Sequence, residues 1–152
     1  MTYTNADARA RLLEDVASAT DQIGTALALL SDAYERLDDH AADRLEAELF
    51  QPAQAAYGLA KRTHAAFADR YGLHAGTFAA QTPAGNPHGA REAIDLAVAA
   101  LQGADTTLAT LQDSMLPVEV GDPELRGGLS GVRELIGTLA RRARELERVL
   151  GR

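Results

Sequence analysis

The chain has 152 residues, of which 46% are hydrophobic and only 5% aromatic, and its formal net charge is −7. This length is enough for one domain with a core, and a composition rich in alanine and poor in aromatic residues favours packed helices over a β-sandwich. The sequence contains no cysteine, which excludes disulfides, thiolate metal sites and cysteine nucleophiles. The negative charge argues against nucleic acid as the main partner.

The first half of the chain shows apolar residues three and four positions apart, which predicts two long amphipathic helices. The first is expected over 6–38, behind Asn5 as the N-cap residue. The second is expected over 41–71 and ends at Gly72, a residue type that commonly follows a helix. Pro52 lies inside this second helix, where an interior proline costs about 3 kcal/mol unless the helix bends. The sequence therefore predicts a kink near Pro52.

The second half predicts two further helices with the same spacing. The third is expected over 87–115, where Asn86 is the N-cap and a proline occupies the first helical position. The fourth is expected over 123–150, behind Asp122, with the same capping chemistry. The residues of the fourth helix that should face the core are Leu125, Leu129, Val132, Ile136, Leu139, Ala143, Leu146 and Leu150.

Short links make neighbouring helices antiparallel, so we expect a single domain over 1–152: an all-α, antiparallel, up-down-up-down four-helix bundle. The segment 73–85 is longer than the usual helix–helix link of about 2–8 residues. It has no lysine or arginine and no phosphate-loop motif. It is either a plain connector between two helical hairpins or a lid that closes over a ligand, and its lack of charged side chains favours the connector.

His64 is the most distinctive single residue, because it falls on the inner side of the second helix together with Tyr57, Phe67 and Tyr71. One interpretation is a core histidine that is hydrogen-bonded to a facing helix. The other is a contact to a small ligand or metal, in a pocket beside the small side chains Ala53 and Ala60. We take His64, Tyr57, Tyr71 and Phe67 as the candidate ligand-binding residues.

A bound metal or cofactor is not expected from the sequence. No glutamate is followed by a histidine three residues later, which a di-iron bundle requires, and no His-Glu-x-x-His motif occurs. His74 and His88 flank the linker and would form at most a weak zinc or nickel site if the linker folded back over the end of the bundle.

Two surface features bear on possible partners. Glycines lie near the middle of each helix (Gly24, Gly58, Gly103 and Gly137), and we expect Gly58 and Gly103 to face outward, where they would allow close approach of a second copy. The stretch 31–48 is acidic and the stretch 141–152 is rich in arginine. These charges are either a solvated surface or an acidic end that meets a partner's basic end.

The function expected from these observations is non-enzymatic, because motifs such as the Gly-x-Ser-x-Gly elbow are missing. We expect a cytoplasmic helical-bundle protein that acts through protein–protein interaction or self-association as a homodimer. The alternative is a small-ligand or metal-binding bundle with a pocket near His64. No membrane partner is expected, since no apolar run is long enough to span a bilayer and the N-terminal segment does not resemble a signal peptide.

Overall fold

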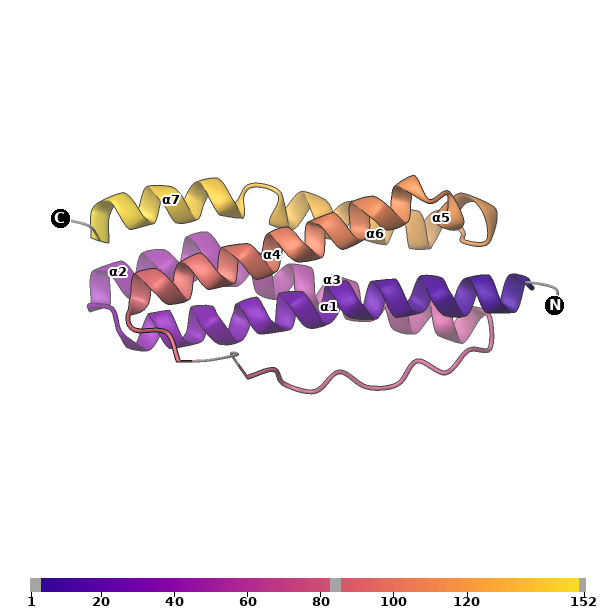
Figure 1. Ribbon diagram of the computed structural model, residues 1–152, viewed down its shortest axis with the longest axis horizontal. Helices are drawn as coiled ribbons and strands as arrows, with labels where there is room; N and C mark the ends of the chain where they lie inside the picture. The colour runs from indigo at the N-terminus through magenta and orange to yellow at the C-terminus, as the bar shows by residue number, and fades with distance from the viewer. Residues whose placement is uncertain (1–3, 83–85, 151–152) are drawn as a thin grey trace.

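A computed structural model describes residues 4–82 and 86–150, and these parts of the chain contain helices but no strand. Four long helical segments lie side by side (Figure 1). In chain order the elements are α1 (Asn5–Glu35), α2 (Asp39–Leu45), the π-helix η1 (Glu46–Phe50), α3 (Gln51–Arg70), α4 (Ala90–Asp113), α5 (Leu116–Glu119), α6 (Pro123–Ile136) and α7 (Leu139–Leu150). The all-helical prediction is confirmed. Among the described helices, none has the length and apolar character needed to cross a bilayer.

The core consists mainly of leucine and alanine from all four segments. Seven of the eight residues predicted to face inward from the fourth segment are buried, and the eighth, Leu150, is partly buried. Alanine lets helices approach closely, and each fully buried leucine contributes about 1.5–3 kcal/mol. The apolar spacing in the sequence therefore locates the core correctly.

The direction of each helix follows from contacts that join distant parts of the chain. The Arg9 side chain, at the start of α1, donates a hydrogen bond of 3.0 Å to the carbonyl of Val120, which follows α4. Arg70, at the end of α3, pairs with Asp122, at the start of α6. Hence α1 is antiparallel to α4, and α3 is antiparallel to α6, while Figure 1 shows α3 and α4 running in the same direction.

These directions correct the predicted up-down-up-down order. Because α3 and α4 run the same way, the linker between Arg70 and Ala90 must return along the whole length of the molecule, as it does in Figure 1. An extended chain gains about 3.3 Å per residue and a helix only about 1.5 Å, so this linker is more than long enough to span the preceding helical segment. Residues 83–85 of the predicted linker lie outside the described residues.

The predicted helix ends are right in two cases. Gly72 follows α3 with a φ of 64°, and the Leu73 N–H donates to the Ala68 carbonyl at 2.8 Å, which closes the end of the helix. Asp122 caps α6 by accepting a hydrogen bond of 2.8 Å from the Leu125 N–H.

The other two predicted caps are wrong. Thr4 rather than Asn5 caps α1. The Thr4 hydroxyl accepts a hydrogen bond from the Asp7 N–H, and the Asp7 carboxylate accepts one from the Thr4 N–H. The cap of α4 is Gly89, three residues after the predicted Asn86, and its extended backbone carries the linker into the helix.

A wide helical turn replaces regular α-helix where the kink is predicted. In η1 the N–H of Gln51 donates to the carbonyl of Glu46, five residues earlier. The backbone stays helical from η1 into α3, so Pro52 lies inside a continuous helical segment, directly after the wide turn. A proline there has no N–H for the regular bond to the residue four positions earlier. The π-turn thus accommodates the proline, and the kink itself stays a prediction.

The fourth segment was expected as one helix but is two. The turn at Gly137 and Thr138 separates α6 from α7. Gly137, one of the four glycines expected near the middle of a helix, therefore marks a break between two helices. Glycine lowers the cost of ending a helix at this point.

Several glycines allow helices to approach closely, and the prediction that Gly103 faces outward is wrong. A Cβ at Gly103 would lie 2.7 Å from Nε2 of Gln22 on α1. On α6, a Cβ at Gly128 would overlap with the Thr63 side chain, and one at Gly131 would lie 2.9 Å from Leu59. These glycines bring α6 against α3.

Replacing Gly128 with alanine should therefore destabilise the protein by about 1–3 kcal/mol, because the new methyl group displaces Thr63 or α6. Gly127→Ala is the matched control, since a Cβ at Gly127 meets no atom within 4 Å. It should stabilise the helix by roughly 0.5–1 kcal/mol. Urea unfolding followed by circular dichroism measures both changes, and equal effects would contradict the close packing of α3 and α6.

Candidate functional site

His64 lines a groove between α1 and the linker. The groove has a volume of about 340 Å³ and is lined by Ala10, Leu13, Glu14, Ala17, His64, Leu73, His74 and Ala75. The ring of Phe78, from the linker, meets the His64 ring edge-on, with 5.1 Å between the ring centroids. The sequence predicted a pocket beside Ala53 and Ala60 instead, but these two side chains are buried in the core.

The imidazole of His64 is almost completely buried, with 4% of its surface exposed. Its Nδ1 atom has no hydrogen-bond partner among the described residues. Burial lowers the pKa of His64, against opposing effects of the Leu13 carbonyl and the Asp21 carboxylate. The ring is therefore neutral near pH 7. A buried polar atom without a partner costs about 1–3 kcal/mol, and a bound group that completes its hydrogen bonds would recover this energy.

The three aromatic residues predicted beside His64 do not line this groove. Phe67 is fully buried in the core, and its ring centroid lies 4.7 Å from that of Tyr71. Tyr57 packs against Gly24, with the Lys61 ammonium 4.4 Å from its ring centroid. The predicted set of four therefore does not surround one pocket: His64 lines the groove, Phe67 packs in the core, and Tyr57 packs against Gly24.

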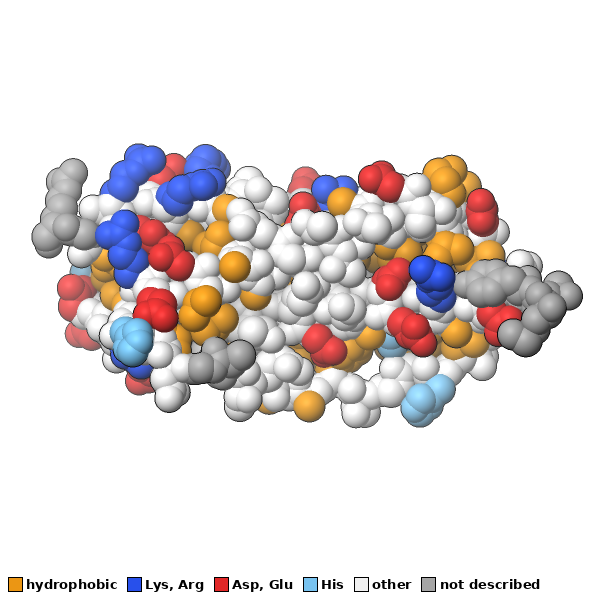
Figure 2. All heavy atoms as spheres, in the orientation of Figure 1, with side chains coloured by type: hydrophobic (Ala, Val, Ile, Leu, Met, Phe, Trp, Pro, Cys, Tyr) orange, Lys and Arg blue, Asp and Glu red, His pale blue; other side chains and the backbone are white. Residues whose placement is uncertain are grey.

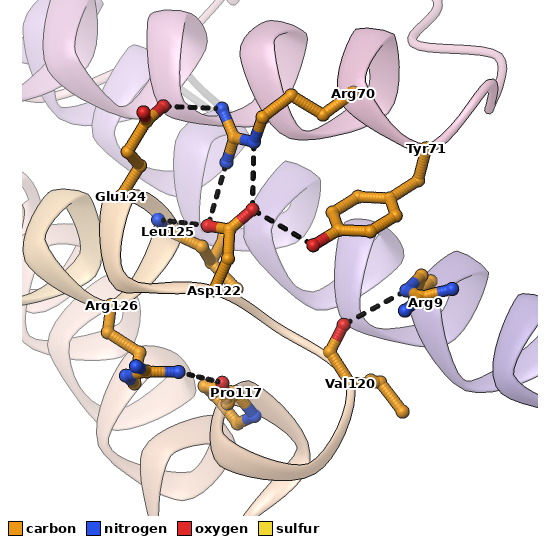
Figure 3. A network of polar contacts seen from close by, with 9 residues as sticks. All are labelled: Arg9, Arg70, Tyr71, Pro117, Val120, Asp122, Glu124, Leu125 and Arg126. Carbon is orange, nitrogen blue, oxygen red and sulfur yellow. Dashed lines mark hydrogen bonds and ion pairs between the residues drawn. The ribbon is translucent and has the colours of Figure 1, made fainter.

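Tyr71 belongs instead to a polar network centred on Asp122 (Figure 3). The Asp122 carboxylate accepts two hydrogen bonds of 2.8 and 2.9 Å from Arg70 and one of 3.1 Å from the Tyr71 hydroxyl. Burial raises the pKa of Asp122, but the hydrogen bonds from Arg70, Leu125 and Tyr71 outweigh it and hold the pKa below its ordinary value. This network joins α3 to α6 and explains Tyr71 as a structural residue.

His74 and His88 are not brought together. His74 lines the groove near Ala10, at the start of α1. The backbone N–H of His88 bonds the Glu92 side chain at the start of α4, which lies at the opposite end of the molecule because α1 and α4 are antiparallel. The described residues contain no group of three or more histidine, aspartate or glutamate side chains with metal-binding geometry.

A buried carboxyl group lies between α4 and α7. Glu147 is largely buried, and its carboxylate is 3.6 Å from the Arg91 guanidinium. Burial and the neighbouring Asp95 carboxyl raise the pKa of Glu147 to about 7, against the opposing charges of Arg91 and Arg144. The acidic pair was not predicted, because only the fold places residues 95 and 147 side by side.

The folded state holds the Glu147 proton more tightly than the unfolded state. The stability that this proton provides is fully present below pH 4.5 and is lost as the pH rises through about 7. Glu147→Gln should remove this loss and stabilise the protein at pH 8 by about 1–2 kcal/mol after solvent screening. Glu145→Gln, which changes an exposed glutamate on the same helix, is the control. The free energy of unfolding in urea, measured from pH 4.5 to 8, tests this. The same dependence of this free energy on pH in Glu147→Gln and in wild type would refute it.

A second hollow lies between the end of α1 and η1. It has a volume of about 290 Å³ and is lined by Ser31, Tyr34, Glu35, Glu46 and Phe50. Tyr34 keeps 39% of its surface exposed. Glu35 and Glu46 form no ion pair with any described residue. We call this hollow the α1–η1 pocket.

Sequence reasoning missed the α1–η1 pocket, although a signal was present. Tyr34 lies within the acidic stretch 31–48, and Phe50 lies two residues beyond it. The missing information was the π-turn, which places Glu46 and Phe50 opposite the end of α1. π-turns inside helices are frequent at functional sites.

The acidic and arginine-rich stretches do not lie at opposite ends. Helix α7 contacts both α2 and η1, and the Arg142 side chain donates a hydrogen bond of 3.2 Å to the Glu48 carbonyl. Figure 2 shows blue and red side chains mixed at the end of the molecule that carries α7. The interpretation of a molecule with one acidic and one basic end is therefore wrong.

Comparison with known proteins gives no relative: no family model matches the chain, and no curated protein or solved structure is similar to it.

Proposed function

We propose that this chain is a cytoplasmic, non-enzymatic protein, built as a four-helix bundle, that acts through contacts with another protein or with itself. The observation that carries the proposal is the α1–η1 pocket. It combines an exposed tyrosine, a half-buried phenylalanine and two glutamates without ion-pair partners among the described residues. Aromatic residues in a shallow pocket are typical anchors of protein–protein contacts.

A second exposed apolar residue supports the same surface. Val149 on α7 has 49% of its surface exposed. It lies two helical turns after Arg142, whose side chain reaches η1, so both residues are on the same side of α7. Tyr34 and Val149 thus belong to two helices that both contact α2 and η1, so a single partner can contact both residues.

A photoreactive amino acid tests this surface. With p-benzoylphenylalanine in place of Tyr34, illumination of cells that express the protein should yield a discrete cross-linked product containing this chain. The same substitution at Glu134, an exposed residue of α6, is the matched control and should yield none. Mass spectrometry identifies the partner. Equal yields at both positions, or no product at position 34, would contradict the proposal.

A second candidate function is the binding of a small amphipathic molecule in the groove beside His64. The observation that favours it is the buried Nδ1 atom, which has no hydrogen-bond partner among the described residues and lies next to a groove lined by alanine and leucine side chains together with Glu14 and His74. The fitting ligand has a short apolar chain and one neutral group that hydrogen-bonds the imidazole. Phe78, over the His64 ring, would then act as part of a lid.

Titration with 1-hexanol, monitored by NMR, tests the groove. Saturable shifts of the His64 and Leu13 signals are expected, since the alcohol has an apolar chain and one hydroxyl. Ala17→Leu should abolish these shifts by filling the groove, whereas Ala66→Leu, which changes a different surface groove between α3 and α6, should not. Shifts that do not saturate, or that persist in Ala17→Leu, would refute this candidate.

A further inference from the structure

We propose that the partner at the α1–η1 pocket is a second copy of this chain, whose α7 arginines enter the pocket while its own pocket receives the α7 arginines of the first copy. The inference rests on the proposed function, because it assumes that this pocket is a protein contact. It goes further by naming the partner and the side chains that each copy contributes.

The pocket has the chemistry of a site for a cationic side chain. Glu35 and Glu46 line it and form no ion pair with a described residue, so both carboxylates are available. The rings of Tyr34 and Phe50 line the same hollow. A guanidinium group stacks on an aromatic face and pairs with carboxylates at the same time, which an ammonium group does less well.

The matching arginines lie on the outer side of α7. Arg141 and Arg148 are exposed and seven residues apart, so they lie on the same side of this helix. Arg148 forms no ion pair with the described residues, and Arg141 has only an exposed pair with Glu145 at 3.1 Å. Such a pair contributes less than about 1 kcal/mol, so it does not prevent Arg141 from changing partner.

The position of these groups favours a two-fold symmetric dimer. Helix α7 and the end of α1 both contact η1, so the pocket and the arginines flank the same short helical segment. In a two-fold contact the same surface of both copies meets, so the acidic side of one copy faces the basic side of the other, and the reverse. A surface with an acidic and a basic side is therefore complementary to a second copy of itself. Val149 and Tyr34 add apolar area to the same contact.

Charge reversal on each side of the contact tests the inference. One variant carries Glu35→Arg and Glu46→Arg, and a second carries Arg141→Glu and Arg148→Glu. All four residues are exposed, so circular dichroism should show native helix content in both. Sedimentation velocity should give a wild-type dimer at low salt that dissociates near 1 M salt, where the Debye length is about 3 Å. Each variant alone should raise the dissociation constant roughly tenfold or more.

An equimolar mixture of the two variants should restore the dimer, because each pocket then meets an α7 of opposite charge. Glu134→Arg, which changes the charge of α6, is the control and should dimerise like wild type. A wild-type protein that stays monomeric at low salt, or a dimer that neither reversal weakens, overturns the inference. If the wild type is monomeric but position 34 still cross-links to a different protein, the proposed function stands and only the identity of the partner is wrong.

Discussion

The structure depends on the linker that returns along the length of the molecule between α3 and α4. Because these two helices run in the same direction, the neighbouring helices are antiparallel: α1 with α3 and α4, and α6 with α3 and α4. The linker is held by side chains that reach inward, such as Phe78 on His64 and Gln81 over Gly24. With these contacts the linker covers one face of the molecule.

This constraint contributes to the burial of His64, whose neighbours on the same face of α3 (Ala60, Phe67 and Ala68) belong to the core. Without the linker, the groove beside Leu13 would be open, and the imidazole would be solvated. The linker supplies Leu73, Ala75 and Phe78 around it, and burial then lowers the pKa of His64. The link between helices thus forms one wall of the groove beside His64, while the π-turn before Pro52 forms one wall of the α1–η1 pocket.

The sequence predicts local structure well and long-range arrangement poorly. Residues three and four apart predict the helices and the buried side of α6 and α7, because burial of one helix face leaves a periodic pattern. Capping at Gly72 and Asp122 is also local and is predicted correctly. The direction of α4 is not local: a link of 13 residues, as predicted for 73–85, permits either a short return or a full crossing. Likewise, no local signal shows that Gly128 meets Thr63 or that Asp95 meets Glu147. Of the four predicted site residues, His64 lines the groove beside the linker, whereas Phe67 packs in the core, Tyr57 packs against Gly24 and Tyr71 bonds Asp122.

The central claim is that the surface around η1 meets a second copy of the chain. Because the sequence has no cysteine, Glu134→Cys gives a protein with one spin label, placed on the exposed side of α6 and outside the proposed contact. Double electron–electron resonance then detects distances only between molecules. The account predicts a single narrow intermolecular distance at low salt that disappears when Glu35 and Glu46 are both changed to arginine. A labelled protein with no intermolecular dipolar signal at low salt would contradict it.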